Sequence, residues 1–145
     1  MQVFLDANVL FSAAYVDRGH ATRLFDLAAA GDCTLLSSGQ ALTEARRNLV
    51  GKAPASLDRF AQLLSLVEIA LDPPGILVAW AADQGLPAKD APILAAAVAA
   101  RADLLVTGDR RHFAPLFDRT VRGVRIVRPA DAVVLVLGAA ARGGG

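Results

Sequence analysis

The sequence predicts a single α/β domain in which a central, mainly parallel sheet of about five strands is flanked by helices on both faces. Short apolar runs rich in strand-forming residues alternate along the chain with segments whose apolar residues recur at helical spacing. Continuous apolar runs are typical of parallel strands, and right-handed crossovers place the connecting helices on both sides of a sheet. A chain of 145 residues has room for one core and too little for two ordinary domains.

The elements follow one another in regular order. Turn residues separate them, among them Pro73-Pro74-Gly75 and Gly108-Asp109. We expect one domain over residues 1–140 and a flexible glycine-rich end over residues 141–145. The predicted strands are residues 3–5, 33–36, 66–69, 104–107 and 124–127, and the predicted helices are residues 21–30, 40–50, 56–64, 76–83 and 91–100.

Composition excludes several classes of protein. Apolar residues make up 54% of the chain, yet no uncharged apolar run reaches the roughly 18 residues that crossing a bilayer demands. The first residues lack the basic start of a signal peptide, and the only cysteine is Cys33, so the chain can form neither an internal disulfide nor a cysteine cluster for zinc. We therefore expect a cytoplasmic protein without a membrane segment. The net charge of +1 means that any nucleic acid must be bound by local basic patches.

Four acidic residues stand where a ligand site is expected. Asp6 ends the first predicted strand and Asp109 follows the fourth, and ligands of open α/β sheets bind beyond the carboxyl ends of the strands. Glu44 lies on the helix after the second strand, and Asp90 opens the helix that leads into the fourth. The topology can bring all four together. Because clustered carboxylates repel one another, such a group is typical of a Mg²⁺ or Mn²⁺ site.

Each acid also has an ordinary structural explanation. Asp6, Asp90 and Asp109 precede possible helix starts, and Asp is a preferred N-cap residue. Glu44 has Arg47 and Asn48 as local partners on its own helix. No single acid decides between a structural role and a metal site.

Taken together, the motifs resemble the PIN domain family. They are Phe4-Leu5-Asp6-Ala7-Asn8-Val9-Leu10, then Leu42-Thr43-Glu44-Ala45-Arg46-Arg47, and then Asp90-Ala91-Pro92-Ile93-Leu94-Ala95-Ala96-Ala97 running into Ala102-Asp103-Leu104-Leu105-Val106-Thr107-Gly108-Asp109. The resemblance extends over nearly the whole chain and includes the closing segment 124–129.

This resemblance implies a metal-dependent ribonuclease, most often the VapC-like toxin of a type II toxin-antitoxin system. It implies that Asp6, Glu44, Asp90 and Asp109 bind one or two Mg²⁺ or Mn²⁺ ions and carry the catalysis, and that the RNA products have 5′-phosphate and 3′-hydroxyl ends. Asn8 and Thr107 fall where the family tends to keep polar side chains that support the acids, although an Asn at a turn or a Thr in a strand is as easily structural.

Basic residues flank two of the acids and are the candidates for RNA binding. Arg46 and Arg47 follow Glu44, and Arg110 and Arg111 follow Asp109, although each arginine could simply cover an apolar surface. His20 is interpreted as a solvated loop residue, and Lys89 and His112 are given no catalytic role. Phe113 and Phe117 could stack on a base, but core packing is the preferred interpretation for both.

Two functional hypotheses remain. In the first, the protein is an RNA-cleaving toxin restrained by a separate antitoxin, and residues 76–80 and 133–137 are candidate surfaces for that partner or for a homodimer. In the second, it is a PIN-like RNA- or protein-binding module without significant nuclease activity. A receiver domain and a P-loop nucleotidase are excluded because their acidic pair and glycine-rich lysine motif are absent from the sequence.

Overall fold

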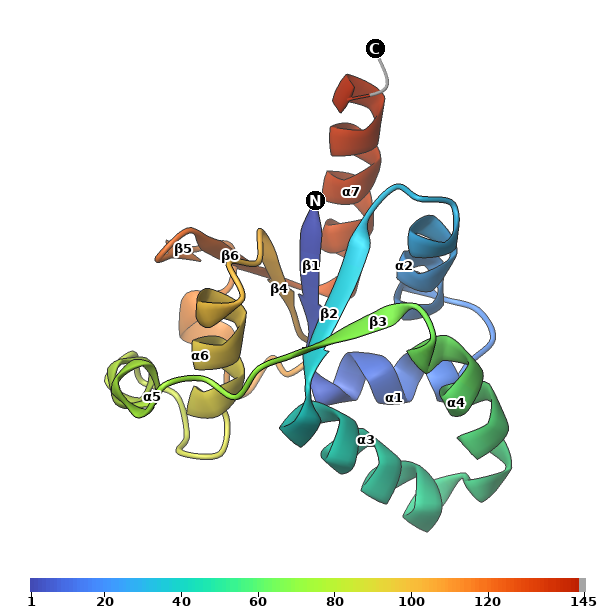
Figure 1. Cartoon of the computed structure of the whole chain (residues 1–145), viewed down its shortest axis with the longest axis horizontal. Helices are drawn as coiled ribbons and strands as arrows, with labels where there is room; N and C mark the ends of the chain where they lie inside the picture. The colour runs from blue at the N-terminus through green and yellow to red at the C-terminus, as the bar shows by residue number, and fades with distance from the viewer. Residues whose placement is uncertain (144–145) are drawn as a thin grey trace.

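Six strands form one sheet in the order β3-β2-β1-β4-β6-β5 (Figure 1), in a computed structural model that describes residues 1–143. All neighbouring strands are parallel except β5 and β6, which form an antiparallel pair at one edge. The strands are β1 (Gln2–Leu5), β2 (Thr34–Ser38), β3 (Val67–Ala70), β4 (Leu104–Val106), β5 (Thr120–Val121) and β6 (Val124–Val127).

Helices cover both faces of the sheet. Figure 1 shows α5 and α6 on one side, with α6 packed against β2 and β4, and α2 and α7 on the other side. The α-helices are α1 (Ala7–Tyr15), α2 (His20–Ala29), α3 (Gly39–Lys52), α4 (Leu57–Leu64), α5 (Gly75–Ala82), α6 (Ala91–Ala99) and α7 (Pro129–Gly143), and η1 (Pro54–Ser56) and η2 (Ala114–Leu116) are short 3₁₀ helices. This arrangement confirms the α/β fold class that the sequence predicts.

The two central strands explain why their sequences are apolar throughout. Val3, Phe4 and Leu5 of β1 have no exposed surface, and all three residues of β4 are buried. A parallel strand with helices on both sides must bury both rows of its side chains, which removes the polar alternation of a one-sided sheet. The core therefore lies on both sides of β1 and β4.

Besides the two 3₁₀ helices, two α-helices and one strand were not among the expected elements. The helix α1 follows β1 directly and buries one side, while Asn8, Ser12 and Tyr15 lie on its more exposed side. The strand β5 has only two residues. The helix α7 continues through Gly143, so the predicted domain boundary at residue 140 falls inside it, whereas residues 144–145 lie outside the described chain.

The order in which the chain adds strands to the sheet reverses between β1 and β4, although β1, β2, β3 and β4 are all parallel. From β1 it proceeds outward to β2 and β3, and it then returns to add β4 on the other side of β1. Such a switch point leaves a crevice at the carboxyl ends of the two strands, because their connections leave in opposite directions. Asp6 directly follows the end of β1, and Asp109 follows the end of β4, so both lie at this crevice.

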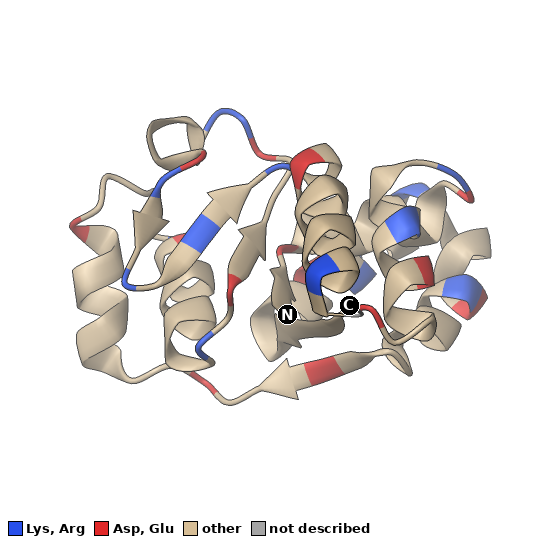
Figure 2. Cartoon of the chain, turned by 90° about the horizontal axis from the view of Figure 1, so that it is seen from above, with Lys and Arg blue, Asp and Glu red and all other residues tan. Residues whose placement is uncertain are grey.

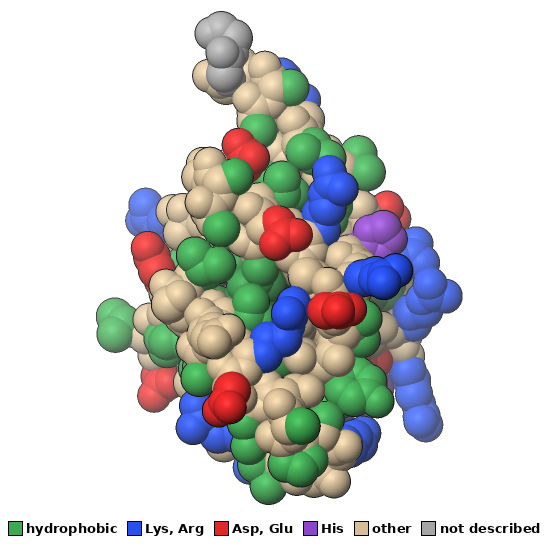
Figure 3. Space-filling view, turned by 90° about the vertical axis from the view of Figure 1, so that its right-hand side faces the viewer, with side chains coloured by type: hydrophobic (Ala, Val, Ile, Leu, Met, Phe, Trp, Pro, Cys, Tyr) green, Lys and Arg blue, Asp and Glu red, His purple; other side chains and the backbone are tan. Residues whose placement is uncertain are grey.

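The surface of the molecule carries both signs of charge. Figure 2 shows Lys and Arg interspersed with Asp and Glu on many elements, and in Figure 3 hydrophobic side chains lie between charged ones. Within residues 1–143, every helix is too short or too polar to cross a bilayer.

Candidate active site

Asp6 and Asp109 meet at the crevice between β1 and β4. The backbone N–H of Asp6 donates to the carbonyl of Val106 at 3.0 Å, which extends the β1–β4 ladder by one step. Asp109 follows the end of β4 by three residues. Because the two strands are parallel neighbours, their carboxyl ends bring these two acids together, as their positions in the sequence predict.

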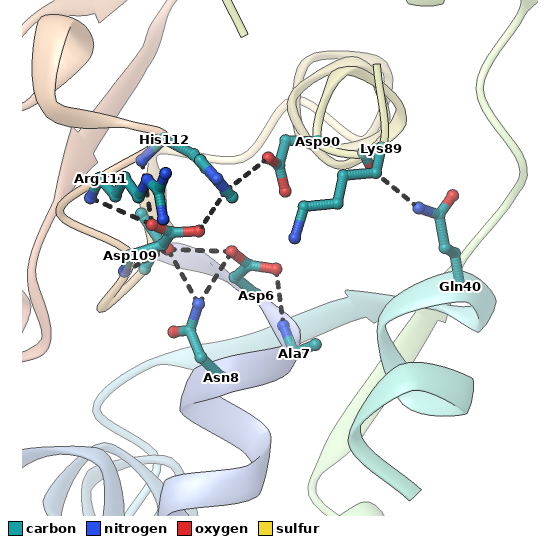
Figure 4. Close-up of polar contacts among 10 residues, drawn as sticks. Asp6, Ala7, Asn8, Gln40, Lys89, Asp90, Asp109, Arg111 and His112 are labelled. Carbon is teal, nitrogen blue, oxygen red and sulfur yellow. Dashed lines mark hydrogen bonds and ion pairs between the residues drawn. The ribbon is translucent and has the colours of Figure 1, made fainter. Parts of the chain in front are cut away.

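The carboxylate of Asp6 is buried and held by three donors. The Thr107 hydroxyl donates to Asp6 Oδ2 at 2.9 Å, the Asn8 side-chain amide donates to the same oxygen at 3.2 Å, and the Ala7 N–H donates to Oδ1 at 2.7 Å (Figure 4). Asp6 has 4% of its surface exposed. The orientation of this carboxylate is therefore fixed by direct contacts with Asn8 and Thr107, the two residues considered as its supports.

Asn8 also fixes the loop that carries Asp109. Its side-chain oxygen accepts a hydrogen bond from the Gly108 N–H at 2.7 Å, and its amide donates to the Thr107 hydroxyl at 3.2 Å. A Cβ at Gly108 would lie 3.4 Å from Asn8 Oδ1, so a residue without a side chain lets the loop approach this closely. One side chain thus links the start of α1 to the end of β4.

Asp90, Asp109 and His112 form a second group beside Asp6. His112 Nδ1 lies 3.1 Å from Asp90 Oδ2 and 2.8 Å from Asp109 Oδ2, so the imidazole stands between two carboxylates (Figure 4). The other oxygen of Asp109 accepts hydrogen bonds from the N–H groups of Arg111 and His112, at 3.1 and 3.0 Å. These two bonds form a turn that returns His112 to the acid.

Glu44 reaches the same place from α3. The Ser38 hydroxyl accepts a hydrogen bond from the Ala41 N–H at 3.1 Å and starts this helix, and the Gln40 side chain donates to the Lys89 carbonyl at 3.0 Å. The second bond ties the beginning of α3 to the loop before α6. All four acids line one cavity of about 240 Å³, together with Ala7, Asn8, Phe11, Asn48, Lys52 and Lys89. We call it the acid cavity.

The acids differ in whether their side chains cap a helix or a turn. Asp6 is the N-cap of α1 and Asp109 caps the turn that follows it, so both combine a backbone role with a place in the cavity. Asp90 stands at the N-cap position of α6, but its side chain makes no capping hydrogen bond. Among the ion pairs within residues 1–143, none includes Glu44. Local structure therefore gives no reason for the acids at positions 44 and 90.

Burial makes two of the acids, Asp6 and Asp90, costly to ionise. Burial raises the pKa of Asp6 from 3.8 to about 6, while its bond from Thr107 lowers the value and the charges of Asp90 and Glu44 raise it. Burial also raises the pKa of Asp90, while the charges of Lys89 and His112 oppose the rise. In Figure 4 the Lys89 side chain points toward the space between Asp6 and Asp90. A nearby positive charge thus stabilises the ionised cluster.

The donor atoms fit a divalent cation. Asp90 Oδ2 and His112 Nδ1 are buried and form no hydrogen bond, although they lie 3.1 Å apart. Asp90, Asp109 and His112 can each offer one ligand atom, and these atoms lie within 4.8 Å of one another. Four carboxylates line the cavity, and the His112 imidazole stands beside two of them. Carboxylates and imidazoles are common ligands of divalent cations in proteins.

The four candidate arginines lie in different surroundings. The Arg46 guanidinium lies 5.7 Å from the centre of the Phe60 ring, where it packs on α4. Arg47 lines a hollow of about 400 Å³ that shares Glu44 and Lys89 with the acid cavity. Arg110 lines a separate cavity on the other side of Asp109. Arg111 is exposed and contributes its backbone N–H to Asp109.

Sequence reasoning missed several residues at or beside the acid cavity. His112, which stands beside it, was given no role, although its i+3 spacing from Asp109 within a turn was a usable signal. Phe11 and Lys52 line the cavity, and the Lys52 ammonium lies 5.9 Å from the centre of the Phe11 ring. No short motif marks these two residues, because α1 and α3 bring them together only in the folded chain.

The comparison with protein-family models decides the family. The model described as PIN domain matches residues 2–111, well over half of the chain, and this segment contains all four acids. The chain belongs to the PIN domain family. The search of curated proteins found no match.

Several solved structures share this PIN fold. VapBC2 from Rickettsia felis, bound to a DNA fragment from its promoter, has a TM-score of 0.67 at 18% identity, over 88% of this chain and 98% of the other. PAE2754 from Pyrobaculum aerophilum has a TM-score of 0.65 at 23% identity, over 95% and 99%. VapBC-1 from nontypeable Haemophilus influenzae has a TM-score of 0.59 at 14% identity, over 90% and 99%. At these identities the likeness establishes a shared fold.

Proposed function

We propose that this PIN domain is a metal-dependent ribonuclease that hydrolyses RNA phosphodiester bonds. The observation that carries the proposal is the meeting of Asp6, Glu44, Asp90 and Asp109, from four distant segments, around one cavity. Asp90 Oδ2 and His112 Nδ1, which lie 3.1 Å apart beside this cavity, are buried and form no hydrogen bond. A buried polar group without a partner costs free energy, so its presence supports a ligand that would satisfy it.

In this proposal the four acids hold one or two Mg²⁺ or Mn²⁺ ions. Such ions, when bound, lower the pKa of water and neutralise charge on the phosphoryl group and the leaving oxygen. Asp6 is the candidate for a ligand shared by two ions, because it ends the central strand. Asp90 and Asp109 would complete the principal shell, and Glu44 would hold a second ion or orient the attacking water.

The chain's own residues would prepare this site. Thr107 and Asn8 hold Asp6 in one orientation through hydrogen bonds to Oδ2. Lys89 lines the cavity and would contribute positive charge toward a bound phosphate. Arg47 would hold RNA on the Glu44 side, where it lines the adjoining hollow. The family resemblance implies products with 5′-phosphate and 3′-hydroxyl ends.

The same proposal includes an antitoxin partner in the cytoplasm. Two similar folds are those of VapBC complexes, and a third is FitAB bound to the IR36 DNA fragment, with a TM-score of 0.58 at 19% identity over 88% of this chain and 94% of the other. Exposed apolar side chains on α5 and α7 support a protein partner or a homodimer. Ile76 is 81% exposed, and Val134 is 69% exposed.

The test is cleavage of defined RNAs by the purified protein. We expect cleavage in Mg²⁺ or Mn²⁺ that stops in EDTA, with 5′-phosphate ends on the products. The Asp6→Asn variant should be inactive and bind Mn²⁺ weakly in calorimetry. Equal cleavage by that variant, or no Mn²⁺ binding by the wild type, would contradict the nuclease proposal and favour a binding module. Co-purification with the product of the neighbouring gene, and inhibition by it, tests the antitoxin.

A further inference from the structure

A second cavity lies beside the acid cavity and has the opposite charge. Its volume is about 410 Å³, and three of its lining residues are basic: His20, Arg110 and Arg128. Asp131 is its one acidic lining residue. We call it the basic pocket. Its remaining walls are Ser12, Ala21, Gly108, Pro129 and Ala130.

The basic residues come from three segments that the fold joins. Arg110 follows β4 and Arg128 follows β6, and these two strands are parallel neighbours. The two arginines therefore lie at the same edge of the sheet, near the carboxyl ends of these strands. Asp6 and Asp109 lie in the same way near the carboxyl ends of β1 and β4. His20 is the first residue of α2 and reaches the pocket from the opposite wall. Arg128 and His20 are far apart in the sequence, and no motif connects them.

A third hollow joins the basic pocket to the acid cavity. It has a volume of about 330 Å³. It shares Asn8 and Asp109 with the acid cavity and Ser12, Gly108 and Pro129 with the basic pocket. Because neighbouring hollows share wall residues, the three adjoin one another near the carboxyl ends of β1, β4 and β6. A strand whose one phosphate lies at the acid cavity would therefore pass close to the basic pocket.

Few acidic side chains lie close enough to the basic residues of this pocket to neutralise their charge. Arg128 lies over the Phe117 ring at 5.4 Å from its centre, and its Nε lies 3.8 Å from Asp131 Oδ2, at the long end of ion-pair distances. Within residues 1–143, neither Arg110 nor His20 takes part in an ion pair. Two arginines beside one carboxylate leave the pocket positive even when His20 is neutral. Stacking on Phe117 holds the Arg128 guanidinium in place, which reduces the entropy lost on binding an anion.

We infer that the basic pocket binds a backbone phosphate of a single-stranded RNA, one that neighbours the phosphate lying at the acid cavity. This inference rests on the proposed function and extends it to a second point on the same substrate. Arginine forks match the oxygens of a phosphate, and a positive groove that follows the backbone is the usual way of holding a single strand. Arg128 lies outside the segment that the family model matches.

The first experiment measures binding without cleavage. A fluorescein-labelled single-stranded RNA is titrated in EDTA with wild-type protein and with Arg110→Ala, Arg128→Lys and His20→Ala variants. We expect Arg110→Ala to weaken binding about 5- to 10-fold, because it removes a charged hydrogen bond to phosphate. The slope of log K against log salt should fall by about 0.7 for each phosphate that the variant no longer binds.

Matched variants separate the pocket from general charge. Arg142→Ala removes the same charge near the end of α7, far along the helix from the pocket, and should leave both affinity and slope unchanged. Arg128→Lys keeps the charge and removes the fork, so it should keep most of the slope and bind less tightly. Thermal melting of each variant shows that it is folded. Equal effects of Arg110→Ala and Arg142→Ala on affinity would overturn the inference.

The second experiment locates the phosphate. Single linkages of the RNA are replaced in turn by neutral methylphosphonates, and each oligonucleotide is titrated against wild type and Arg110→Ala. Replacing one linkage near the cleaved bond should lower the RNA affinity of wild type about as much as Arg110→Ala does. The same replacement should change the affinity of Arg110→Ala little, because that variant has no arginine there to bind the phosphate. If every replaced linkage lowered the affinity of wild type and of Arg110→Ala by the same factor, the inference would be overturned.

These readouts separate the two proposals. Cleavage that persists while binding is insensitive to the pocket variants would overturn the phosphate site and leave the ribonuclease proposal standing. Pocket-dependent binding without any metal-dependent cleavage would support the phosphate site and contradict the nuclease. Absence of RNA binding under all conditions would overturn the phosphate site directly.

Discussion

The acid cavity and the basic pocket occupy adjacent strand ends, yet they are built differently. In the acid cavity, Asp6 is buried and receives three hydrogen bonds, and two neighbours fix its orientation. In the basic pocket, Arg110 is exposed and His20 lies at the tip of a helix. Metal ligands must be held in a fixed direction, whereas phosphate contacts need charge and reach. The contrast predicts that the same kind of substitution has very different costs in the two regions.

The largest expected effect is on catalysis. Asp90→Asn removes a proposed metal ligand and should lower kcat/KM for RNA cleavage on the order of 100- to 1,000-fold, since metal ligation supplies several kcal/mol to the transition state. Arg110→Ala should lower it by no more than about 10-fold, because it removes one bond to phosphate. Initial rates on one labelled RNA compare them. Similar decreases in both variants would contradict the division into two functions.

The acid cavity should also set the pH dependence of stability without metal. The pKa of Asp6 is raised from 3.8 to about 6, so between these values the folded state binds more protons than the unfolded state. The stabilising contribution of Asp6 to the free energy of unfolding is therefore fully present below pH 3.8. It decreases as the pH rises to about 6, and the total decrease is at most about 3 kcal/mol.

Urea unfolding in EDTA between pH 4 and pH 7 measures this effect. The Asp6→Asn variant is the control, because its amide does not titrate. We expect the wild type to lose stability relative to the variant as the pH rises. A difference that stays constant, or that moves in the opposite direction, would show that the folded state does not raise the pKa of Asp6.

The supports of Asp6 should have a smaller effect. Asn8→Ala removes the hydrogen bonds to Asp6 and to the Gly108 loop, and Thr107→Val removes the hydroxyl. Each should weaken Mn²⁺ binding by about 10- to 100-fold, the usual cost of losing an outer hydrogen-bond partner of a ligand. Calorimetric titration with Mn²⁺ measures it. Ser12→Ala, which changes the adjoining hollow without touching an acid, should bind as wild type does.

The smallest effect is expected from the two arginines that follow Glu44. Arg46 packs over Phe60, so Arg46→Ala should change RNA affinity by less than about 2-fold. Arg47 lines the hollow beside Glu44, and Arg47→Ala should weaken binding about 3- to 5-fold because it removes an exposed charge. Anisotropy titrations in EDTA compare the two variants. A larger decrease in Arg46→Ala would show that its side chain leaves Phe60 to reach RNA.

The difference between these two arginines also indicates what the sequence could not supply. Both are exposed residues of one helix, and the sequence predicts the helix but not which neighbour each side chain meets. His112 and Lys89 are similar cases, because their relation to the acids depends on a turn and on the packing of α6 against the sheet. Helix α1 was not predicted because it has only nine residues, fewer than the roughly 11 over which helical periodicity is read.

By itself the sequence determined the alternation of strands and helices, the buried parallel strands and the positions of Asp6 and Asp109 at strand ends. These features depend on local propensity and on the rule that parallel strands end at a common edge. Only the tertiary structure decided that His112 stands between Asp90 and Asp109, and that His20, Arg110 and Arg128 share a pocket. Side-chain contacts between distant segments depend on strand order and helix packing, which no local pattern of residues encodes.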